Sequence, residues 1–346
     1  MMPLKVIRYS ACLLAAFAFN SAQAGRFYLP PNDVPFVGRI QHYSTIKSDT
    51  LSDIARLYGV GHDEIVAANP DVDVWMPGVD VDVVLPTRFI LPGSVRKGIV
   101  VNLPEMRLYH YSEDEHGRSV VTTHPVSVGR MDWRTPLGQS SIVAKATDPN
   151  WYPPASILAE HEADGDPLPR IVPAGPDNPL GRHMLRLGIP GYLIHGTNRP
   201  YGVGMRVTHG CLRMYPEDIE WLYSEVPVET QVVLLNEPYK LARLGDRYFI
   251  EVHQSLEEEP ELATETLSNV MQEIEQAAGK QAAAVVDQVA LLKLVENASG
   301  LPEVVPLLPQ IDEPSEDEFK HVKDSQSGAA QASTADSIPE YSALTE

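Results

Sequence analysis

Cysteine is scarce in this chain of 346 residues, which contains two, Cys12 and Cys211. Cys12 falls in an N-terminal segment that we expect to be removed, so Cys211 would remain as a single thiol. A single cysteine excludes an intramolecular disulfide, and in an oxidising compartment it indicates pairing between molecules or a reactive centre. An inert, buried cysteine is the simpler interpretation, so the choice depends on the residues around Cys211.

Long hydrophobic runs are also missing. An apolar run over residues 11–19 follows Lys5 and Arg8 and precedes the small residues 22–24, Ala-Gln-Ala. This order of charge, apolar run and small residues predicts a cleavable secretory signal peptide over residues 1–24. A transmembrane helix needs about 20 apolar residues, and no later run reaches that length. The sequence therefore predicts an exported protein without a transmembrane segment.

Positive charge is in short supply. The formal net charge is -20, and residues 251–346 hold 20 Asp and Glu against 4 Lys. Nucleic acid and anionic membranes would repel such a surface, so we expect neither as a partner. After residue 300 the chain is rich in Pro, Ser, Asp and Glu and has little apolar surface to bury. That composition predicts a disordered acidic tail over residues 300–346.

The remaining sequence divides into four segments. Residues 25–40 are rich in Pro and Gly and are predicted to be a leader or linker, and residues 41–87 are predicted to form a small module. Residues 96–237 contain many short strand patterns with Gly and Pro turns, which is typical of an all-β sandwich or barrel. Residues 238–299 predict a strand, DRYFIEVH, followed by helices.

The 41–87 module has the pattern of a βααβ unit. A short strand is expected over 43–46, a helix from Leu51 with Asp49 or Thr50 as its cap, a second helix capped by Asp63, and a strand over 79–85. The segments DTL, IARLYGV, ANP and the closing VVLP resemble the LysM domain. That resemblance implies binding of the N-acetyl sugars of peptidoglycan; a packing module without a ligand stays open as the alternative.

Residues 149–182 are dense in Pro, Gly and Asp, so an irregular loop is expected there. A loop of this length inside a compact domain is commonly a lid or a binding loop. His161 within it is expected to be a surface residue. After it, the segment GYLIHGT predicts a strand that ends at His195, and Pro216 predicts the start of a helix.

Cys211 needs a partner to act as a nucleophile, because a thiol attacks only as its thiolate. His195 and His209 are the two candidate bases, and spacing alone does not choose between them. The positive end of the helix at Pro216 could also favour the thiolate. Gly210 would let a substrate carbonyl approach backbone N–H groups that form an oxyanion hole.

Two other interpretations of these residues were open. His195, His209 and Cys211 could bind zinc, since catalytic zinc sites use three protein ligands and a water. The missing second cysteine and the glycine-rich surroundings make that less favoured, and no metal or other cofactor is expected. A purely structural role for all three residues is the other alternative.

The segment IHGTNRPYGVGMRVTHGCLRM resembles the signature of the L,D-transpeptidases of the YkuD family, and VGRMDWRTPLGQ resembles that family's Thr-Pro-x-Gly turn. The resemblance covers about residues 96–237. It implies a mainly β catalytic domain of the YkuD type, preceded by the LysM-like module. The likeness is strongest to a periplasmic subgroup, some of whose members attach the outer-membrane (Braun) lipoprotein to peptidoglycan.

The resemblance also implies roles for individual residues. Cys211 would be the nucleophile and His195 the general base and later acid, with the carbonyl of Gly196 orienting its imidazole. His209 and Gly210 would shape the nucleophile loop and the oxyanion site. Three further residues are candidates for substrate binding: Arg206, Thr208 and Arg213.

The implied reaction is acyl transfer on peptidoglycan in the periplasm. Cys211 would form a thioester with a tetrapeptide stem, release the terminal D-alanine and pass the acyl group to an amine. Expected partners are glycan strands and stem peptides, with a lipoprotein lysine or a diaminopimelate side chain as the acceptor. A hydrolase on the same fold, acting as a carboxypeptidase or amidase, is one alternative, and a non-catalytic peptidoglycan-binding protein is the other.

Overall fold

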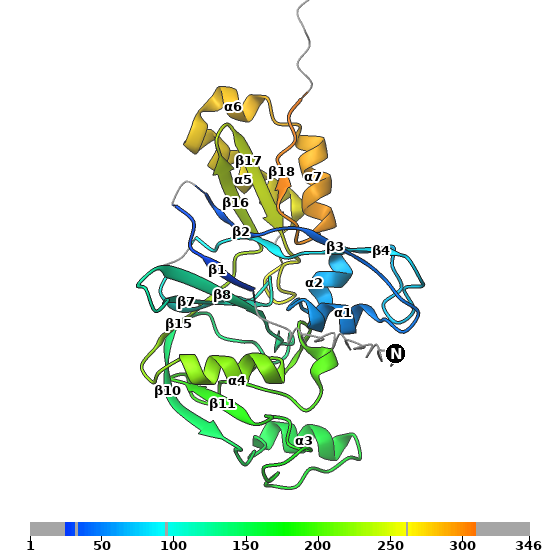
Figure 1. Cartoon of the computed structure of the whole chain (residues 1–346), viewed down its shortest axis with the longest axis vertical. Helices are drawn as coiled ribbons and strands as arrows, with labels where there is room; N and C mark the ends of the chain where they lie inside the picture. Colours follow the sequence, from blue (N-terminus) through cyan, green and yellow to red (C-terminus); the bar gives the residue numbers. More distant parts are fainter. Residues whose placement is uncertain (1–24, 32–33, 94–95, 261, 309–346) are drawn as a thin grey trace, which may run out of the picture. The chain divides into compact units, whose positions relative to one another are not determined.

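A computed structural model describes residues 25–31, 34–93, 96–260 and 262–308 of the chain (Figure 1). The chain divides into two units, residues 1–306 and 307–346. The expected signal peptide lies outside the described residues, as does the expected tail beyond residue 308. Among the described residues, no helix is long and apolar enough to cross a membrane.

The first unit is mainly β, as expected, and is built on a nine-stranded sheet with the order β1-β8-β7-β6-β15-β10-β11-β12-β14. Neighbouring strands are antiparallel, except for the parallel pairs β6–β15 and β12–β14. The strands are β1 (Gly25–Tyr28), β6 (Gly98–Asn102), β7 (Arg107–Glu113), β8 (Ser119–Pro125), β10 (Gly138–Thr147), β11 (His183–Leu187), β12 (Leu193–His195), β14 (Leu212–Arg213) and β15 (Gln231–Leu235).

The expected leader over residues 25–40 is not a free linker. Strand β1 pairs with β8 and forms one edge of the nine-stranded sheet, and β2 (Phe36–Gly38) pairs with β5 (Arg88–Ile90). With β7 on its other side, β8 would be left with a row of unpaired backbone groups if β1 did not pair with it. The Pro and Gly residues keep the strands of this segment short, but the segment still packs as part of the fold.

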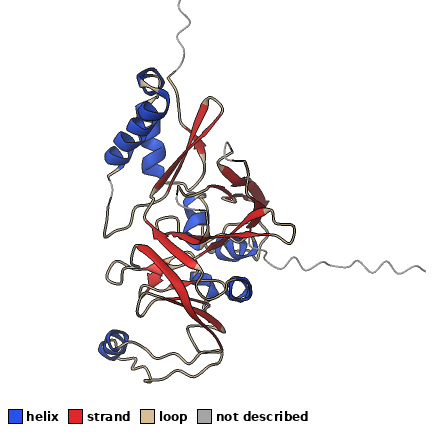
Figure 2. Ribbon diagram, turned by 90° about the vertical axis from the view of Figure 1, so that its left-hand side faces the viewer, coloured by secondary structure: helices blue, strands red, loops and turns tan. Residues whose placement is uncertain are grey.

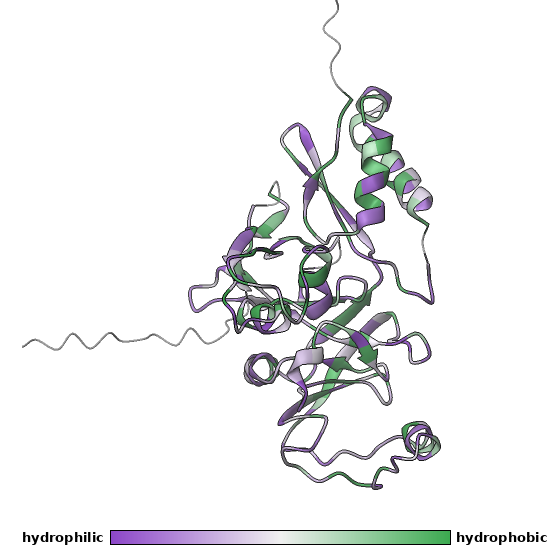
Figure 3. Ribbon diagram, turned by 90° about the vertical axis from the view of Figure 1, so that its right-hand side faces the viewer, coloured by the Kyte–Doolittle hydropathy of each residue, from purple (hydrophilic) through white to green (hydrophobic). Residues whose placement is uncertain are grey.

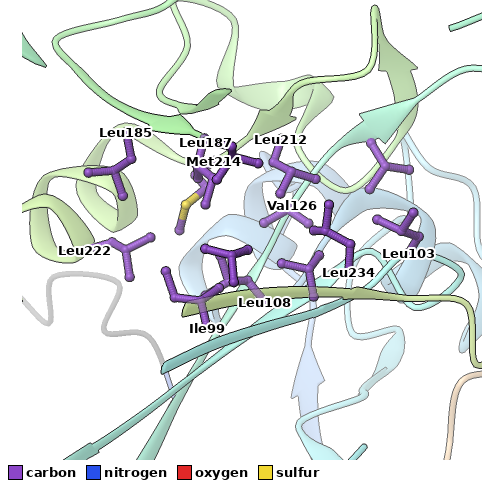
Figure 4. Close-up of a cluster of buried hydrophobic side chains, with 14 of the residues drawn as sticks. Ile99, Leu103, Leu108, Val126, Leu185, Leu187, Leu212, Met214, Leu222 and Leu234 are labelled. Atoms are coloured by element: carbon purple, nitrogen blue, oxygen red, sulfur yellow. The ribbon is translucent and has the colours of Figure 1, made fainter. Parts of the chain in front are cut away.

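Helix α4 (Pro216–Glu225) covers one face of this sheet and contacts β11 (Figure 1). Pro216 occupies its first turn, as expected, and Ile219 and Leu222 share its buried face. They meet side chains from the sheet such as Ile99 and Leu108 in one core (Figure 4). Burial of one such side chain stabilises the fold by about 1.5–3 kcal/mol.

The βααβ module has the expected order of β3 (Gln41–Ser44), α1 (Leu51–Leu57), α2 (His62–Ala67) and β4 (Asp82–Leu85). Thr50 caps α1, because its Oγ1 accepts from the Asp53 N–H at 3.1 Å. Asp63 is not the cap of α2. Gly61 takes that position, and its N–H donates to Glu64 Oε2 at 2.5 Å.

This module is joined to the nine-stranded sheet by buried and backbone contacts. Arg107 of β7 is fully buried and pairs with Glu64 of α2 at 2.7 Å. The N–H groups of His62 and Asp63, in the first turn of α2, donate to the carbonyls of Val203 and Gly204, each at 3.0 Å. The segment that precedes Cys211 therefore lies directly against the module.

The 149–182 loop is not irregular throughout, because it contains α3 (Ala155–Ala163). Figure 2 shows this helix at the far end of a long excursion from the sheet. Trp151 and Val172 exchange backbone hydrogen bonds and close the base of the excursion. Within α3 only Ile157 is buried, which explains why the sequence carries no amphipathic pattern there. His161 is part-exposed, in keeping with the surface position expected for it.

The residues after Pro238 form a further β and helical part of the unit. It contains β16 (Tyr239–Leu244), β17 (Arg247–Val252), β18 (Glu303–Val304), α5 (Ala263–Ala278), α6 (Lys280–Ala284) and α7 (Gln288–Asn297). Figure 3 shows hydrophobic and hydrophilic residues mixed along these helices, whose apolar residues pack on the small sheet. The tail does not begin at residue 300, since β18 pairs with β17 and Val305 is buried.

Candidate active site

Two parallel strands bring the expected histidine and cysteine to one face of the sheet. Strand β12 ends at His195, and β14 begins directly after Cys211. In their register Ile194 lies opposite Leu212 and His195 opposite Arg213. Alternate residues of a strand share a face, so Cys211, Arg213 and His195 project from the same side and His195 and Cys211 are diagonal neighbours.

His195 is almost completely buried, with 5% of its surface exposed. Its Nδ1 lies 2.6 Å from the carbonyl oxygen of Gly196. A carbonyl only accepts, so Nδ1 carries the hydrogen and Nε2 keeps its lone pair. Burial and the nearby Arg213 cation lower the pKa of His195 to about 4, so its imidazole is neutral at pH 7. The Gly196 carbonyl thus makes the contact expected of it.

Cys211 is half-buried, and its Sγ donates to the Gly191 carbonyl at 3.7 Å. Burial raises the pKa of this thiol, while the Leu193 backbone N–H and the Arg213 charge partly offset that rise. These two groups supply favourable charge at the sulfur. The first turn of α4 instead carries Glu217 and Asp218, which pair with Arg56 and His124. The resting sulfur is therefore a thiol that needs a base.

Gly210 is required by the geometry of the nucleophile loop. Its φ of +97° is a conformation that side chains disfavour, and a Cβ would stand 2.7 Å from the Tyr192 ring. Its N–H donates to Thr208 Oγ1 at 3.2 Å, and its carbonyl accepts from Thr135 Oγ1 at 2.9 Å. The Gly210 N–H is therefore engaged. The N–H of Cys211 has no acceptor among the described residues and is the better oxyanion donor.

His209 is directed away from the role of base. Its Nε2 lies 2.8 Å from Glu160 Oε2, and its ring meets Trp133 edge-on at a centroid distance of 5.0 Å. Among the described residues, the ligand atoms of His195, His209 and Cys211 do not converge on a common point as zinc would require. Of the two candidate bases, the geometry favours His195.

A different group of His and carboxylate side chains does converge in the described part of the chain: Glu105, Glu251 and His253. Lys240 already lies among them, with its Nζ 2.9 Å from Glu105 and 2.5 Å from Glu251. Its ammonium offsets one of the two carboxylate charges, and the cluster links β16 and β17 to the turn between β6 and β7.

The two arginines expected to bind substrate differ in their surroundings. Arg206, of β13 (Arg206–Thr208), pairs with Glu258 at 2.7 Å and donates to the Gly129 carbonyl. Arg213 has no carboxylate partner among the described residues, and its buried Nε lacks an acceptor. Burial and the charge of Arg199 lower the pKa of Arg213. Arg213, whose charge acts on the Cys211 thiol, and its neighbour Arg199 have no carboxylate partner among the described residues, so the pair is suited to a carboxylate.

Thr208 contributes to the loop itself rather than to an open surface. It is 2% exposed, and its Oγ1 donates to the Cys211 carbonyl at 2.6 Å. The sequence pattern did not indicate Arg199, Thr135, Glu160 or Glu258 as neighbours of the site. Arg199 lies in the signature segment and could have been noticed there, whereas Glu160 and Glu258 are far from it in sequence.

Comparisons with known proteins identify the family of the chain. Residues 96–234 match the YkuD model, described as the L,D-transpeptidase catalytic domain. The chain is 38% identical over 312 residues to "Probable L,D-transpeptidase YbiS" of Escherichia coli, covering 87% of this chain and 98% of that protein. It is also 38% identical over 268 residues to "Probable L,D-transpeptidase YcfS" of the same organism, covering 74% and 82%.

Solved structures of the same name are also similar. An L,D-transpeptidase from Mycobacterium smegmatis matches with a TM-score of 0.31 and 19% identity, covering 46% of this chain and 64% of that one. The catalytic domain of the Enterococcus faecium L,D-transpeptidase matches with a TM-score of 0.31 and 20% identity, covering 41% and 100%. On the sequence matches over most of its length, the chain belongs to the YkuD family of L,D-transpeptidases.

Proposed function

We propose that this enzyme is a cysteine-dependent L,D-transpeptidase that acts on peptidoglycan tetrapeptide stems in the periplasm. The observation that carries the proposal is the register of β12 and β14, which puts Cys211 and His195 on one face as diagonal neighbours. A neutral imidazole with a free Nε2 and a protonated thiol are the two components of a nucleophile activated by general base catalysis.

The first half of the reaction forms a thioester. Cys211 Sγ attacks the carbonyl carbon of the third stem residue as its proton passes to His195 Nε2. The Cys211 N–H stabilises the oxyanion, and the imidazolium then donates its proton to the nitrogen of the departing D-alanine. The bond between carbonyl and nitrogen breaks, and the acyl group remains on sulfur.

The second half transfers the acyl group to an amine. The incoming amine attacks the thioester carbonyl, His195 takes a proton from its nitrogen, and the sulfur leaves and is reprotonated. A new amide replaces the old one, so no external energy source is needed. The acceptor is the side-chain amine of a lipoprotein lysine or of a diaminopimelate in another stem.

Arg213 and Arg199 are suited to bind a carboxylate of the stem. The two guanidinium groups lie close enough for the charge of Arg199 to lower the pKa of Arg213, and the buried Nε of Arg213 has no hydrogen-bond partner among the described residues. A guanidinium binds a carboxylate through two parallel hydrogen bonds, so the pair would orient the stem with its scissile carbonyl at the sulfur. Arg206 is less suited to bind a substrate carboxylate, because its charge is already paired with Glu258.

The 41–87 module is proposed to bind glycan strands. Exposed apolar side chains lie on its two adjoining loops: Ile46, Trp75, Met76 and Val79. Thr45 bonds to Asp80 and Val81, which holds these loops side by side. An exposed indole offers a flat surface for the C–H face of a sugar ring. Trp75→Ala should reduce retention on purified sacculi and leave cleavage of a free stem peptide unchanged.

Product analysis tests the reaction type. The enzyme is incubated with disaccharide-tetrapeptide, with and without a peptide ending in lysine, and the products are weighed by mass spectrometry. A transpeptidase releases D-alanine and adds the acceptor mass. Free tripeptide alone, with the acceptor present, would favour the hydrolase. An unchanged substrate with reduced Cys211 would favour the non-catalytic binding protein.

A further inference from the structure

The attachment of α3 to the rest of the unit depends on few groups. Of its nine residues, Ile157 alone is buried, so apolar contact holds the helix weakly. The base of the 149–182 loop is fixed separately, since Asn178 donates to the carbonyls of Pro149, Val172 and Pro173. Polar contacts of α3 therefore carry much of its attachment near the active site.

Glu160 provides that polar contact. Its carboxylate accepts from Arg130, in the turn after β9 (Val128–Gly129), and lies 2.8 Å from His209 Nε2. These hydrogen bonds, first from Arg130 and then from His209, lower the pKa of Glu160 to about 2, so it is ionised at all physiological pH values. One carboxylate thus joins α3 to two segments of the catalytic domain.

Both segments also determine the backbone of the nucleophile loop. His209 precedes Gly210 and Cys211 directly, and its ring rests against Trp133 of the 130–135 turn. Thr135, at the end of the same turn, donates to the Gly210 carbonyl. The position of the Cys211 N–H and sulfur therefore depends on contacts that Glu160 holds in place.

We propose that Glu160 is a positioning residue, through which docking of α3 and ordering of the Cys211 loop become one event. When the 149–182 loop is docked, Glu160 fixes His209 and the 130–135 turn, and the nucleophile is set for attack. When the ion pairs open, α3 and the nucleophile loop lose order together. The effect on catalysis rests on the function proposed above, whereas the coupling between the two segments does not.

The test compares Glu160→Gln with Glu162→Gln. Both substitutions remove one negative charge from α3, but Glu162 is exposed and has no described partner. Hydrogen exchange on full-length enzyme without substrate is the first measurement. In Glu160→Gln the amides of residues 155–163 and 208–212 should lose protection together, while Glu162→Gln should match the parent. Loss confined to 155–163 would overturn the proposal.

Acylation by disaccharide-tetrapeptide is the second measurement. Misplacement of a nucleophile lowers the chemical step more than binding, so Glu160→Gln should reduce the acylation rate constant about tenfold with little change in KM. Salt between about 0.05 and about 0.5 M should slow the parent and not the variant, because it screens part-exposed ion pairs. Glu160→Asp should restore part of the rate.

Hydrogen exchange and acylation distinguish a failure of the structural coupling from a failure of the proposed reaction. Equal acylation by Glu160→Gln and Glu162→Gln would overturn the positioning role. If the parent enzyme forms no adduct while exchange remains coupled, the proposed transpeptidase reaction fails and the structural coupling stands.

Discussion

At the scale of single residues, the site contains a neutral pair rather than an ion pair. Burial raises the pKa of Cys211, and burial with the Arg213 charge lowers the pKa of His195 to about 4. At pH 7 the sulfur keeps its proton and the imidazole lacks one. The proton therefore moves during attack on the substrate, which confines reactivity to a bound and oriented stem.

Alkylation of Cys211 by iodoacetamide tests this pair without substrate. The reagent reacts with the thiolate, whose fraction grows about tenfold per pH unit below the pKa of the thiol. With a pKa raised above its ordinary value of 9.0, the rate should rise without a plateau through pH 9. A plateau between about pH 5 and pH 7 would indicate a thiolate–imidazolium pair and contradict the neutral assignment.

Arg213→Gln should impair stem recognition without harming the fold. Hydrogen bonds to a charged group contribute about 1.5–3 kcal/mol, so kcat/KM on the tetrapeptide should fall by about 10- to 100-fold. Thermal unfolding should not occur at a lower temperature, because the variant removes a half-buried cation that has no carboxylate partner among the described residues.

The matched control is Arg247→Gln, which removes an exposed charge from β17. It should leave kcat/KM unchanged. Stems whose carboxylates are replaced one at a time by carboxamides identify the bound group, since the difference between parent and variant should disappear for one of them. An equal loss on every stem would show that Arg213 acts without contacting a carboxylate.

The sequence was a sufficient guide to residues within the signature segment. Short strands put Cys211 and His195 on one face, and the Gly196 carbonyl lies 2.6 Å from His195 Nδ1, while their catalytic roles stay predictions. Glu160 and Glu258 could not be found that way. Each reaches its partner across 49 or 52 residues of chain, and nothing in their local sequence marks them.

At the scale of elements, periodic segments were predictable and polar ones were not. Helix α4 and the βααβ order follow from apolar spacing and from capping residues such as Thr50 and Pro216. Helix α3 has no buried stripe to signal it, and Pro and Gly surround it. The module docks through an ion pair between Glu64 and Arg107. This is a tertiary contact between distant segments, so the local sequence of neither segment predicts it.

Glu64→Gln tests how firmly the module is joined. The Arg107 side chain is fully buried, so loss of the Glu64 charge leaves a cation without its counterion. Breaking a buried pair in this way costs about 3–5 kcal/mol, measurable as a lower free energy of unfolding in urea. Asp71→Asn, an exposed change in the same module, should cost less than about 0.5 kcal/mol. Equal values for both would show that the pair does not join the parts.

At the scale of the whole molecule, residues beyond the domain boundaries predicted from composition still pack against the parts that precede them. Leu256 lies in an acidic run, yet it is buried in the core of the catalytic sheet, and Glu258 beside it pairs with Arg206. Strand β18 and Val305 complete the sheet of β16 and β17 beyond the expected boundary at residue 300. A single apolar residue in a polar stretch carries too weak a signal to locate such contacts.

Two truncations test the revised boundary. A chain ending at Leu308 keeps β18 and Val305, so its unfolding temperature and activity should equal those of the parent. A chain ending at Ser299 loses both, and removal of a buried valine alone costs about 1.5–3 kcal/mol. Its unfolding temperature should be clearly lower. Equal stability of the two chains would show that residues 300–308 do not contribute to the fold.

The most direct measurement is the intact mass of the enzyme after brief exposure to disaccharide-tetrapeptide. The account predicts an adduct equal to the substrate minus one alanine, held on Cys211 and released by a lysine-ended peptide. It also predicts no adduct with Cys211→Ala, and a much slower one with His195→Ala. An unmodified mass with reduced thiol, or an adduct that persists in Cys211→Ala, would contradict it.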